Sequence, residues 1–198
     1  MTEHDFPYSS LIGGWYAPNN VCDDLIDLYK NADSKDKIPG KTFNGNVPGK
    51  KSTDLTISLE STNHPTIKNY FIYLQKSLEN YLEKYPMVNT LEAFDLNEPF
   101  NIQYYKPNEG FGEEHFEHCG SWPLSRRCLV FMTYLNDVPE GGTVFPHQQL
   151  TSPAKKGLTM IWPAFFTHSH KGQIANAEKY IITGWYSFND KDKLRGLL

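Results

Sequence analysis

The stretch "GEEHFEHCG", residues 112–120, gathers two histidines, three glutamates and one cysteine in nine positions. His115 and Glu117 are separated by one residue, so on an extended backbone their side chains point to the same side. One imidazole and one carboxylate could therefore reach a single ion, while Phe116 between them would point away and pack. Because such a short pair also occurs by chance in solvated loops, it needs support from elsewhere in the chain.

A second pair of histidines repeats this spacing further along the chain. His168 and His170 lie in "FTHSHKG" and, on an extended segment, would also share one side. Two imidazoles and one carboxylate on one face of an ion form the facial triad of non-haem Fe(II) oxygenases, which leaves coordination positions open. From spacing alone either histidine could be the third ligand, and both could equally be surface histidines.

The N-terminal part of the chain contains two predicted helices. The segment 21–32, "VCDDLIDLYKNA", has an apolar face, and Asn19 or Asn20 is the expected N-cap. Residues 64–86 form the clearest helix, because their apolar side chains recur at spacings of three and four. Pro65 fits the first turn of that helix, where its missing N–H costs little.

After residue 86 the pattern changes to short apolar or alternating segments separated by Gly, Pro and Asn-Asp turns. These segments are "FNIQYY", "CLVFMTYL", "TVFP", "GLTMIWP" and "KYIITGWYSF". Short strands at such spacing are typical of a β-sandwich or barrel. The fold class predicted is therefore mainly β with N-terminal helices. Residues 33–52, rich in Lys, Gly, Asn and Pro, are expected to form a long surface loop.

Composition argues against several classes of protein. The net charge is −4 and no basic stripe is present, so nucleic acid is not an expected partner. The cysteines are odd in number and widely spaced, which favours a reducing compartment over a disulfide scaffold; they are Cys22, Cys119 and Cys128. The N-terminus lacks the features of a signal peptide, and no apolar run is long enough to span a bilayer. We therefore expect a cytoplasmic protein without a membrane partner.

Four phrases in the β half stand together in a known order: "YYKPNEGFGEEHFE", "RRCLVFMTYLNDVPEGGTVFP", "KKGLTMIWP" and "HKGQIANAEKYIITGWYSF". Together they resemble the prolyl 4-hydroxylase branch of the 2-oxoglutarate/Fe(II)-dependent dioxygenases. The resemblance covers roughly residues 98–188 and implies a double-stranded β-helix (jelly-roll, cupin-like) core. Because no linker separates the helices from the β half, one domain is expected over 1–198, in which 98–188 form the catalytic β core and 1–97, which match the family only loosely, a helical support.

The same resemblance implies a set of metal ligands. His115, Glu117 and His170 match the two histidines and the carboxylate that hold iron in the family. His170 is preferred to His168 because it stands in the family's HxG context. The family norm at the carboxylate position is Asp, so Glu117 is a departure. Because a carboxylate is still present, hydroxylation remains the simplest activity to expect.

Further residues are implied to bind the cosubstrate. In the family a lysine in a "K-aromatic-x-x-T-x-W" setting pairs with the distal carboxylate of 2-oxoglutarate, and "KYIITGW" matches that phrase. Lys179 is therefore the expected cosubstrate cation and Thr183 a second contact. Tyr105 and Tyr134 are either further cosubstrate contacts or core tyrosines with satisfied hydroxyl groups. Arg127 opens a predicted strand, where it faces the substrate entrance or ends the strand in solvent.

The chemistry of 2-oxoglutarate supports Lys179 independently of the resemblance. The molecule is a dianion, so the carboxylate far from the metal needs a fixed cation if it is to be buried. Lys179 lies in an otherwise apolar predicted strand, which is what that requires. The alternative is a lysine at a strand edge whose ammonium group reaches water.

The activity implied is hydroxylation of a C–H bond with Fe(II), 2-oxoglutarate and O₂, with ascorbate as an optional accessory. A peptidyl proline, hydroxylated at C4, is the first expectation for the substrate, and the 33–52 loop could close over such a peptide. A free amino acid or another small metabolite is the alternative substrate. A cupin-like metal-binding module without turnover is a third hypothesis. The sequence leaves the oligomeric state open.

Overall fold

The computed structural model describes residues 1–41, 45 and 49–189. It contains two α-helices, α1 (Asn19–Asn31) and α2 (Pro65–Lys84). Short 3₁₀ helices are η1 (Tyr8–Ser10), η2 (Ser34–Asp36), η3 (Leu59–Asn63), η4 (Pro86–Thr90), η5 (Leu124–Arg126) and η6 (Phe166–His168).

The strands form two antiparallel sheets. The large sheet has eight strands in the order β1-β9-β6-β11-β5-β3-β2, with β4 paired to β11. Its strands are β1 (Gly13–Tyr16), β2 (Lys37–Pro39), β3 (Thr53–Ile57), β4 (Phe94–Asp95), β5 (Phe100–Tyr105), β6 (Arg127–Tyr134), β9 (Leu158–Pro163) and β11 (Lys179–Phe188). The small sheet has the order β10-β7-β8, formed by β7 (Thr143–Phe145), β8 (Leu150–Thr151) and β10 (Lys171–Gly172). The fold is mostly β with two helices, which confirms that part of the predicted fold class.

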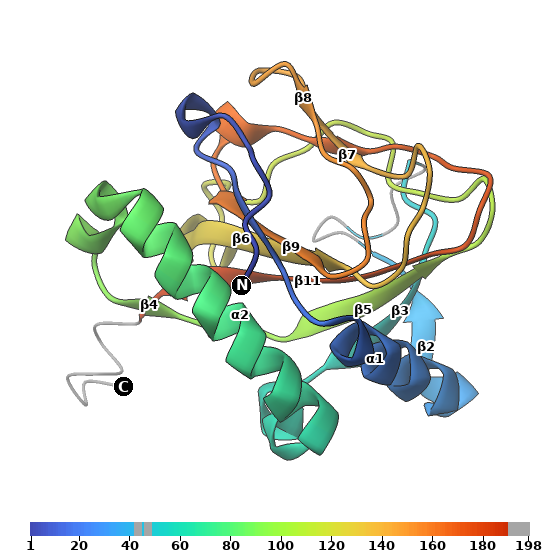
Figure 1. Cartoon of the computed structure of the whole chain (residues 1–198). Helices are drawn as coiled ribbons and strands as arrows, with labels where there is room; N and C mark the ends of the chain where they lie inside the picture. Colours follow the sequence, from blue (N-terminus) through green and yellow to red (C-terminus); the bar gives the residue numbers. More distant parts are fainter. Residues whose placement is uncertain (42–44, 46–48, 190–198) are drawn as a thin grey trace.

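The large sheet lies between the helices and the small sheet (Figure 1). Because side chains alternate across a strand, each central strand contributes to two cores. On β6, Leu129 and Phe131 pack with the helices, whereas Val130 and Met132 face the other core. The same alternation on β11 sends Ile182 toward the helices. The second face of the large sheet is the one that carries the candidate site.

Both predicted helices are confirmed, with one correction at a cap. α1 begins directly after Pro18, which makes no side-chain cap, so the expectation that Asn19 or Asn20 is the N-cap was wrong. Pro18 already fixes an extended φ and ψ at the boundary, and both asparagines lie inside the first turn. α2 has Pro65 in its first turn, as predicted, and the His64 ring accepts the Thr66 N–H there.

The predicted loop 33–52 is more structured than the sequence suggested. It contains η2 and the short strand β2, which pairs with β3. Residues 42–44 and 46–48 of this segment, on which a covering role over a substrate would depend, lie outside the described residues. Among the helices that the structure describes, none has the length and apolar character required to cross a membrane.

Candidate active site

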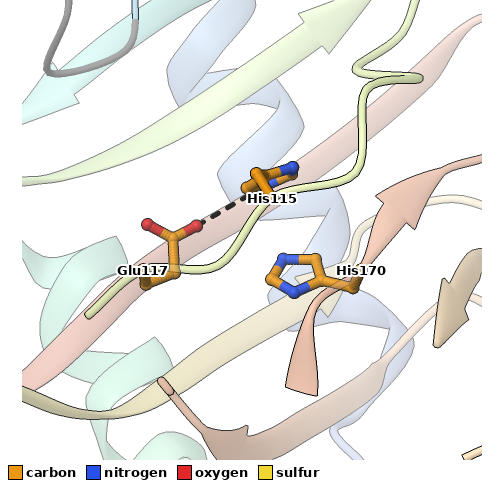
Figure 2. Close-up of side chains that lie close together, drawn as sticks. All are labelled: His115, Glu117 and His170. Carbon is orange, nitrogen blue, oxygen red and sulfur yellow. Dashed lines mark ion pairs between the residues drawn. The ribbon is translucent and has the colours of Figure 1, made fainter. Parts of the chain in front are cut away.

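Three predicted residues converge on the cavity face of the large sheet. His115 and Glu117 come from one segment and His170 from the segment that enters β10 (Figure 2). Each offers one ligand atom, and these three atoms lie within 4.8 Å of one another. His115 Nε2 is 3.6 Å from Glu117 Oε1. This donor set, two imidazoles and a carboxylate, suits Fe(II) and leaves coordination positions open.

The hydrogen bonds of the two histidines orient the rings toward this point. His115 Nδ1 is 2.9 Å from the Glu113 carbonyl oxygen, and His170 Nδ1 is 3.0 Å from the His168 carbonyl oxygen. Since a carbonyl only accepts, each Nδ1 must carry the proton and donate. Each Nε2 then keeps its lone pair, which is the arrangement that ligating histidines commonly have.

Aromatic rings pack against both histidines. The Phe111 ring stacks on His115 with centroids 3.9 Å apart, and Trp162 and Phe145 pack around His170. Burial first, and then the neighbouring His115 ring, lower the pKa of His170 to about 3. His170 is therefore neutral at physiological pH, as a metal ligand must be.

His168 occupies a different environment from His170. It ends the 3₁₀ helix η6, so the expectation that the two histidines share one side of an extended segment was wrong. Its Nε2 is 2.9 Å from the Ser10 carbonyl oxygen, and its Nδ1 is 3.0 Å from Thr167 Oγ1. Both ring nitrogens of His168 are thus engaged by groups outside the triad. Because of the 3₁₀ turn, the rings of His168 and His170 lie in different environments, which the sequence spacing alone could not predict.

Glu117 has a second partner that the sequence did not indicate. Arg127 Nη1 donates to Glu117 Oε2 over 2.9 Å, so the two carboxylate oxygens face different groups. Arg127 is held in turn by Glu98, whose Oε2 accepts from Nη2 over 2.6 Å. Arg127 lines the cavity, but its guanidinium group faces these two carboxylates. Glu98 lies in a turn before β5 and belongs to no recognisable motif, which is why sequence reasoning missed it.

Lys179 lies inside the same cavity. Its side chain is 5% exposed, and Nζ donates to the carbonyl oxygens of Gly141 and Gln173 over 3.2 and 3.0 Å. No carboxylate within the described part of the chain forms an ion pair with it. Burial lowers the pKa of Lys179 to about 8. A buried ammonium group that is bonded to carbonyl oxygens and has no counter-charge provides a binding position for an anionic group.

The other predicted cosubstrate residues also line this cavity. The Tyr105 ring lies 5.0 Å from Lys179 Nζ, and its hydroxyl donates to Gln103 Oε1 over 2.6 Å. The Tyr134 hydroxyl is 2.7 Å from Thr143 Oγ1, and Thr183 Oγ1 donates to the Phe131 carbonyl over 3.0 Å. All three hydroxyl groups therefore have protein partners, and all three residues line the cavity that contains Lys179.

The cavity has a volume of about 1070 Å³ and opens to solvent near the triad. Phe116 and Phe166 line its mouth and are 44% and 55% exposed. The expectation that Phe116 packs in the interior was wrong. Only His115 pairs with His170 as in a β-sheet, and the backbone that follows is irregular and does not continue as a strand. Ligand pockets commonly measure about 300–1,000 Å³, so this one can hold a small dianion and part of a second molecule.

The sequence of the chain is similar to that of a viral relative. It is 23% identical, over 203 aligned residues, to a putative prolyl 4-hydroxylase of Acanthamoeba polyphaga mimivirus; the alignment covers 92% of this chain and 78% of that protein. No protein-family model matches the chain.

Three solved structures have the same fold. A viral collagen prolyl hydroxylase from Paramecium Bursaria Chlorella virus-1, solved as its 2-oxoglutarate complex, has a TM-score of 0.67 at 16% identity, covering 90% of this chain and 97% of that one. A prolyl-4-hydroxylase of Pseudomonas putida has a TM-score of 0.67 at 14% identity, with coverages of 92% and 95%. A prolyl hydroxylase of Trichoplax adhaerens, in complex with a hypoxia inducible factor peptide fragment, has a TM-score of 0.68 at 13% identity, with coverages of 96% and 87%.

These similarities confirm the resemblance to prolyl 4-hydroxylases that the four sequence phrases indicated. The chain resembles prolyl 4-hydroxylases over nearly its whole length and shares the fold of several of them. The shared fold includes the N-terminal part, where the sequence motifs gave only weak support.

Proposed function

We propose that this chain is an Fe(II)- and 2-oxoglutarate-dependent dioxygenase that hydroxylates a proline residue in a peptide, at C4. The observation that carries the proposal is one cavity that contains both a His–Glu–His cluster and a buried lysine with no carboxylate partner within the described residues. A metal-binding module needs only the first of these groups. An enzyme that binds 2-oxoglutarate needs both.

In this proposal His115, Glu117 and His170 hold the iron. Their chemistry fits the metal, since two neutral imidazole nitrogens and one carboxylate oxygen are favourable ligands for Fe(II). The closeness of the three ligand atoms supports the assignment, as do the Nδ1 protons that both histidines donate to backbone carbonyls. His170 is preferred to His168, whose ring nitrogens are engaged elsewhere.

Lys179 is proposed to pair with the distal carboxylate of 2-oxoglutarate. The buried ammonium would gain a counter-charge, and the dianion would avoid an unpaired buried charge. Tyr105 and Tyr134 border this part of the cavity, and Thr183 lies on the same face of β11 as Lys179. We assign these three residues to the walls of the cosubstrate pocket, where their hydroxyl groups could add a further contact.

The open mouth of the cavity supports a peptide rather than a metabolite as the substrate. A free amino acid would be recognised best in a closed pocket, whereas a peptide must enter and leave as a continuous chain. Phe116 and Phe166 at the mouth are large and exposed, and aromatic side chains are the usual docking groups for proline-containing segments. The peptide bound to the Trichoplax adhaerens structure of the same fold agrees with this choice.

The residues of this chain bind and orient the reactants, and the cofactor supplies the oxidation. When iron is bound, one atom of O₂ enters succinate as 2-oxoglutarate loses CO₂, and the other becomes the hydroxyl oxygen on the substrate carbon. The three ligands leave coordination positions free for the cosubstrate and O₂. Lys179 fixes the direction in which 2-oxoglutarate lies, and the rings of Phe111, Phe145 and Trp162 form apolar walls beside the two histidines.

We also propose that the two sheets form the double-stranded β-helix implied by the resemblance, as one domain. The position of the cavity on the face of the large sheet away from the helices supports this arrangement.

The test is release of succinate from 2-oxoglutarate by the protein loaded with Fe(II) in air, in the presence of proline-containing peptides. The wild type should release succinate and His115→Ala should not. Equal melting temperatures of the two proteins would show that the variant is folded. Binding of iron and 2-oxoglutarate without succinate release would instead support the non-catalytic module. Turnover with a free amino acid, and with no peptide, would support the metabolite hydroxylase.

A further inference from the structure

Glu117 occupies the position at which the resemblance to prolyl 4-hydroxylases leads us to expect Asp. In the structure its longer side chain contacts an arginine, Arg127, which is bound in turn by a second carboxylate, Glu98. Arg127 donates to Glu117 Oε2 from Nη1 over 2.9 Å. Its Nε donates to both oxygens of Glu98 over 3.1 Å, and Nη2 donates to Glu98 Oε2 over 2.6 Å. Glu98 Oε1 also accepts from the Ser187 hydroxyl over 2.8 Å. Glu117 is therefore the end of a continuous chain of hydrogen bonds.

We infer that Arg127, held by Glu98, is a positioning residue that restricts Glu117 to one oxygen for the metal. The inference rests on the proposed function, since it concerns the same metal site. Oε2 is engaged by Arg127, while Oε1 lies on the side of His115. A carboxylate held in this way binds an ion through a single oxygen, and the coordination position that a second oxygen would take stays free. The longer side chain of Glu allows it to reach both the arginine and the ion.

An irregularity in β6 explains how Arg127 comes to face the site. The pairing of β6 with β11 shifts between Tyr186 and Ser187, so that Leu129 pairs with Tyr186 and Arg127 pairs with Ser187. Without this bulge, Arg127 and Leu129 would point to the same face, which is the helix side of the sheet. Instead, Leu129 packs in the helix-side core and Arg127 lines the cavity.

Packing fixes the guanidinium group in place. The side chain of Arg127 is 11% exposed, and its guanidinium carbon lies 3.5 Å from the centre of the Trp185 ring. A planar guanidinium that is stacked on one face and bonded at three nitrogens has little freedom to turn. The orientation of Glu117 is thus set by a rigid partner rather than by its own rotamer preference.

Glu98 has a second effect, which is electrostatic. A lone arginine beside a ligand would repel a divalent cation, because the two charges have the same sign. Glu98 offsets the charge of Arg127 from the side away from Glu117. Arg127 can therefore orient the ligand without a net loss of attraction for the ion. Replacing Glu98 should for this reason weaken metal binding even where the shape of the site is kept.

Anaerobic titration with Co(II), followed by its visible absorption, tests this inference without relying on activity. The variants are Glu98→Gln, Arg127→Gln and the matched control Arg126→Gln, whose arginine donates to the Phe188 carbonyl instead. We expect Glu98→Gln to weaken Co(II) binding about 10-fold, within the range for residues that orient ligands. We expect Arg127→Gln to change the Co(II) spectrum, because Oε2 is released and can coordinate. Arg126→Gln should match the wild type in both measurements.

The outcomes separate this inference from the proposed function. If the wild type binds Co(II), His115→Ala does not, and either Glu98→Gln or Arg127→Gln matches the wild type in both affinity and spectrum, the positioning role is wrong. If His115→Ala binds Co(II) as the wild type does, the metal site itself is wrong. Should Arg127→Gln fail to fold, Glu98→Gln decides the matter, because an amide of the same shape still accepts a hydrogen bond from Arg127.

Discussion

His115 and His170 are joined by two backbone hydrogen bonds, from the N–H of each residue to the carbonyl of the other, over 3.0 and 2.8 Å. This pairing brings together two segments that are far apart in the chain. The relative position of the two rings is thus determined by the backbone as well as by the side chains. Substitution of either ring removes a proposed ligand without removing the pairing, so single variants of the site can be interpreted.

The two histidines of "HSH" should behave differently when each is replaced by alanine. His170→Ala should lower Fe(II) or Co(II) affinity by at least about 100-fold, because a neutral ligand is lost from the site. His168→Ala should leave metal affinity within a few-fold of the wild type, since the His168 ring nitrogens contact the Ser10 carbonyl and Thr167.

His168→Ala should instead reduce stability by about 1–3 kcal/mol, because the buried Ser10 carbonyl loses its donor. Calorimetric metal titration and thermal unfolding measure the two effects separately. The opposite result, in which His168→Ala abolishes metal binding and His170→Ala does not, would exchange the two assignments.

Lys179 gives the site a dependence on pH. In the protein without cosubstrate, burial lowers the pKa of Lys179 to about 8, so the ammonium is charged below that pH and loses its charge above it. The distal carboxylate of 2-oxoglutarate pairs only with the charged form. The affinity for 2-oxoglutarate should therefore be constant below pH 8 and fall about 10-fold per pH unit above it.

Anaerobic titration of the Co(II)-loaded protein with 2-oxoglutarate, repeated across this pH range, measures the effect. Lys179→Arg is the matched control, because an arginine stays charged throughout and should remove the pH dependence whatever its affinity. Lys179→Met should bind 2-oxoglutarate at least about 100-fold more weakly at pH 7. Equal affinities for Lys179→Met and the wild type would exclude Lys179 from the cosubstrate pocket.

Glu117 should not be replaceable by Asp, although Asp is the residue expected from the family resemblance. The shorter side chain draws the carboxylate back by about one C–C bond, so it cannot reach both Arg127 and the ion. We expect Glu117→Asp to weaken Co(II) binding about 10-fold or more. The loss should shrink in the Arg127→Gln background, because the shorter carboxylate is then free to turn toward the metal; additive losses would contradict the coupling.

The exposed aromatic residues at the cavity mouth should act on the peptide alone. Phe116→Ala and Phe166→Ala should raise KM for a peptide substrate several-fold while leaving KM for 2-oxoglutarate unchanged, since both rings lie at the opening. The control variant is Ile72→Ala, because Ile72 is an exposed apolar residue on α2. The neighbouring Phe71 is not used, because its ring packs in the helix-side core. If the two Phe variants and Ile72→Ala have the same KM for the peptide, the peptide does not cross the mouth.

The sequence predicted which strands and segments carry the site better than it predicted which way their side chains point. The expectation that Lys179 lies in an otherwise apolar strand is confirmed, because Lys179 is the first residue of β11. Directions inferred from an extended backbone were wrong for His168 and Phe116, where the backbone is not extended. The 3₁₀ turn at His168 and the bulge beside Arg127 both change which way a side chain points.

The roles of residues that belong to no motif could not be predicted from the sequence either. Glu98 acts through a contact across the sheet, and Phe111 acts by stacking on His115, so neither carries a local signal. The resemblance suggested the three proposed ligands, but only the three-dimensional arrangement shows that Glu117 lies between His115 and Arg127.

The most direct test of the proposed proline hydroxylation is a mass measurement on a proline-containing peptide after incubation with the Fe(II)-loaded protein, 2-oxoglutarate and O₂. The peptide should gain the mass of one oxygen atom, located on proline by fragmentation, in an amount equal to the succinate formed. His115→Ala should produce neither. Succinate formation with no oxygen on any peptide, or peptide oxidation that His115→Ala and the wild type produce equally, would contradict the proposed hydroxylation.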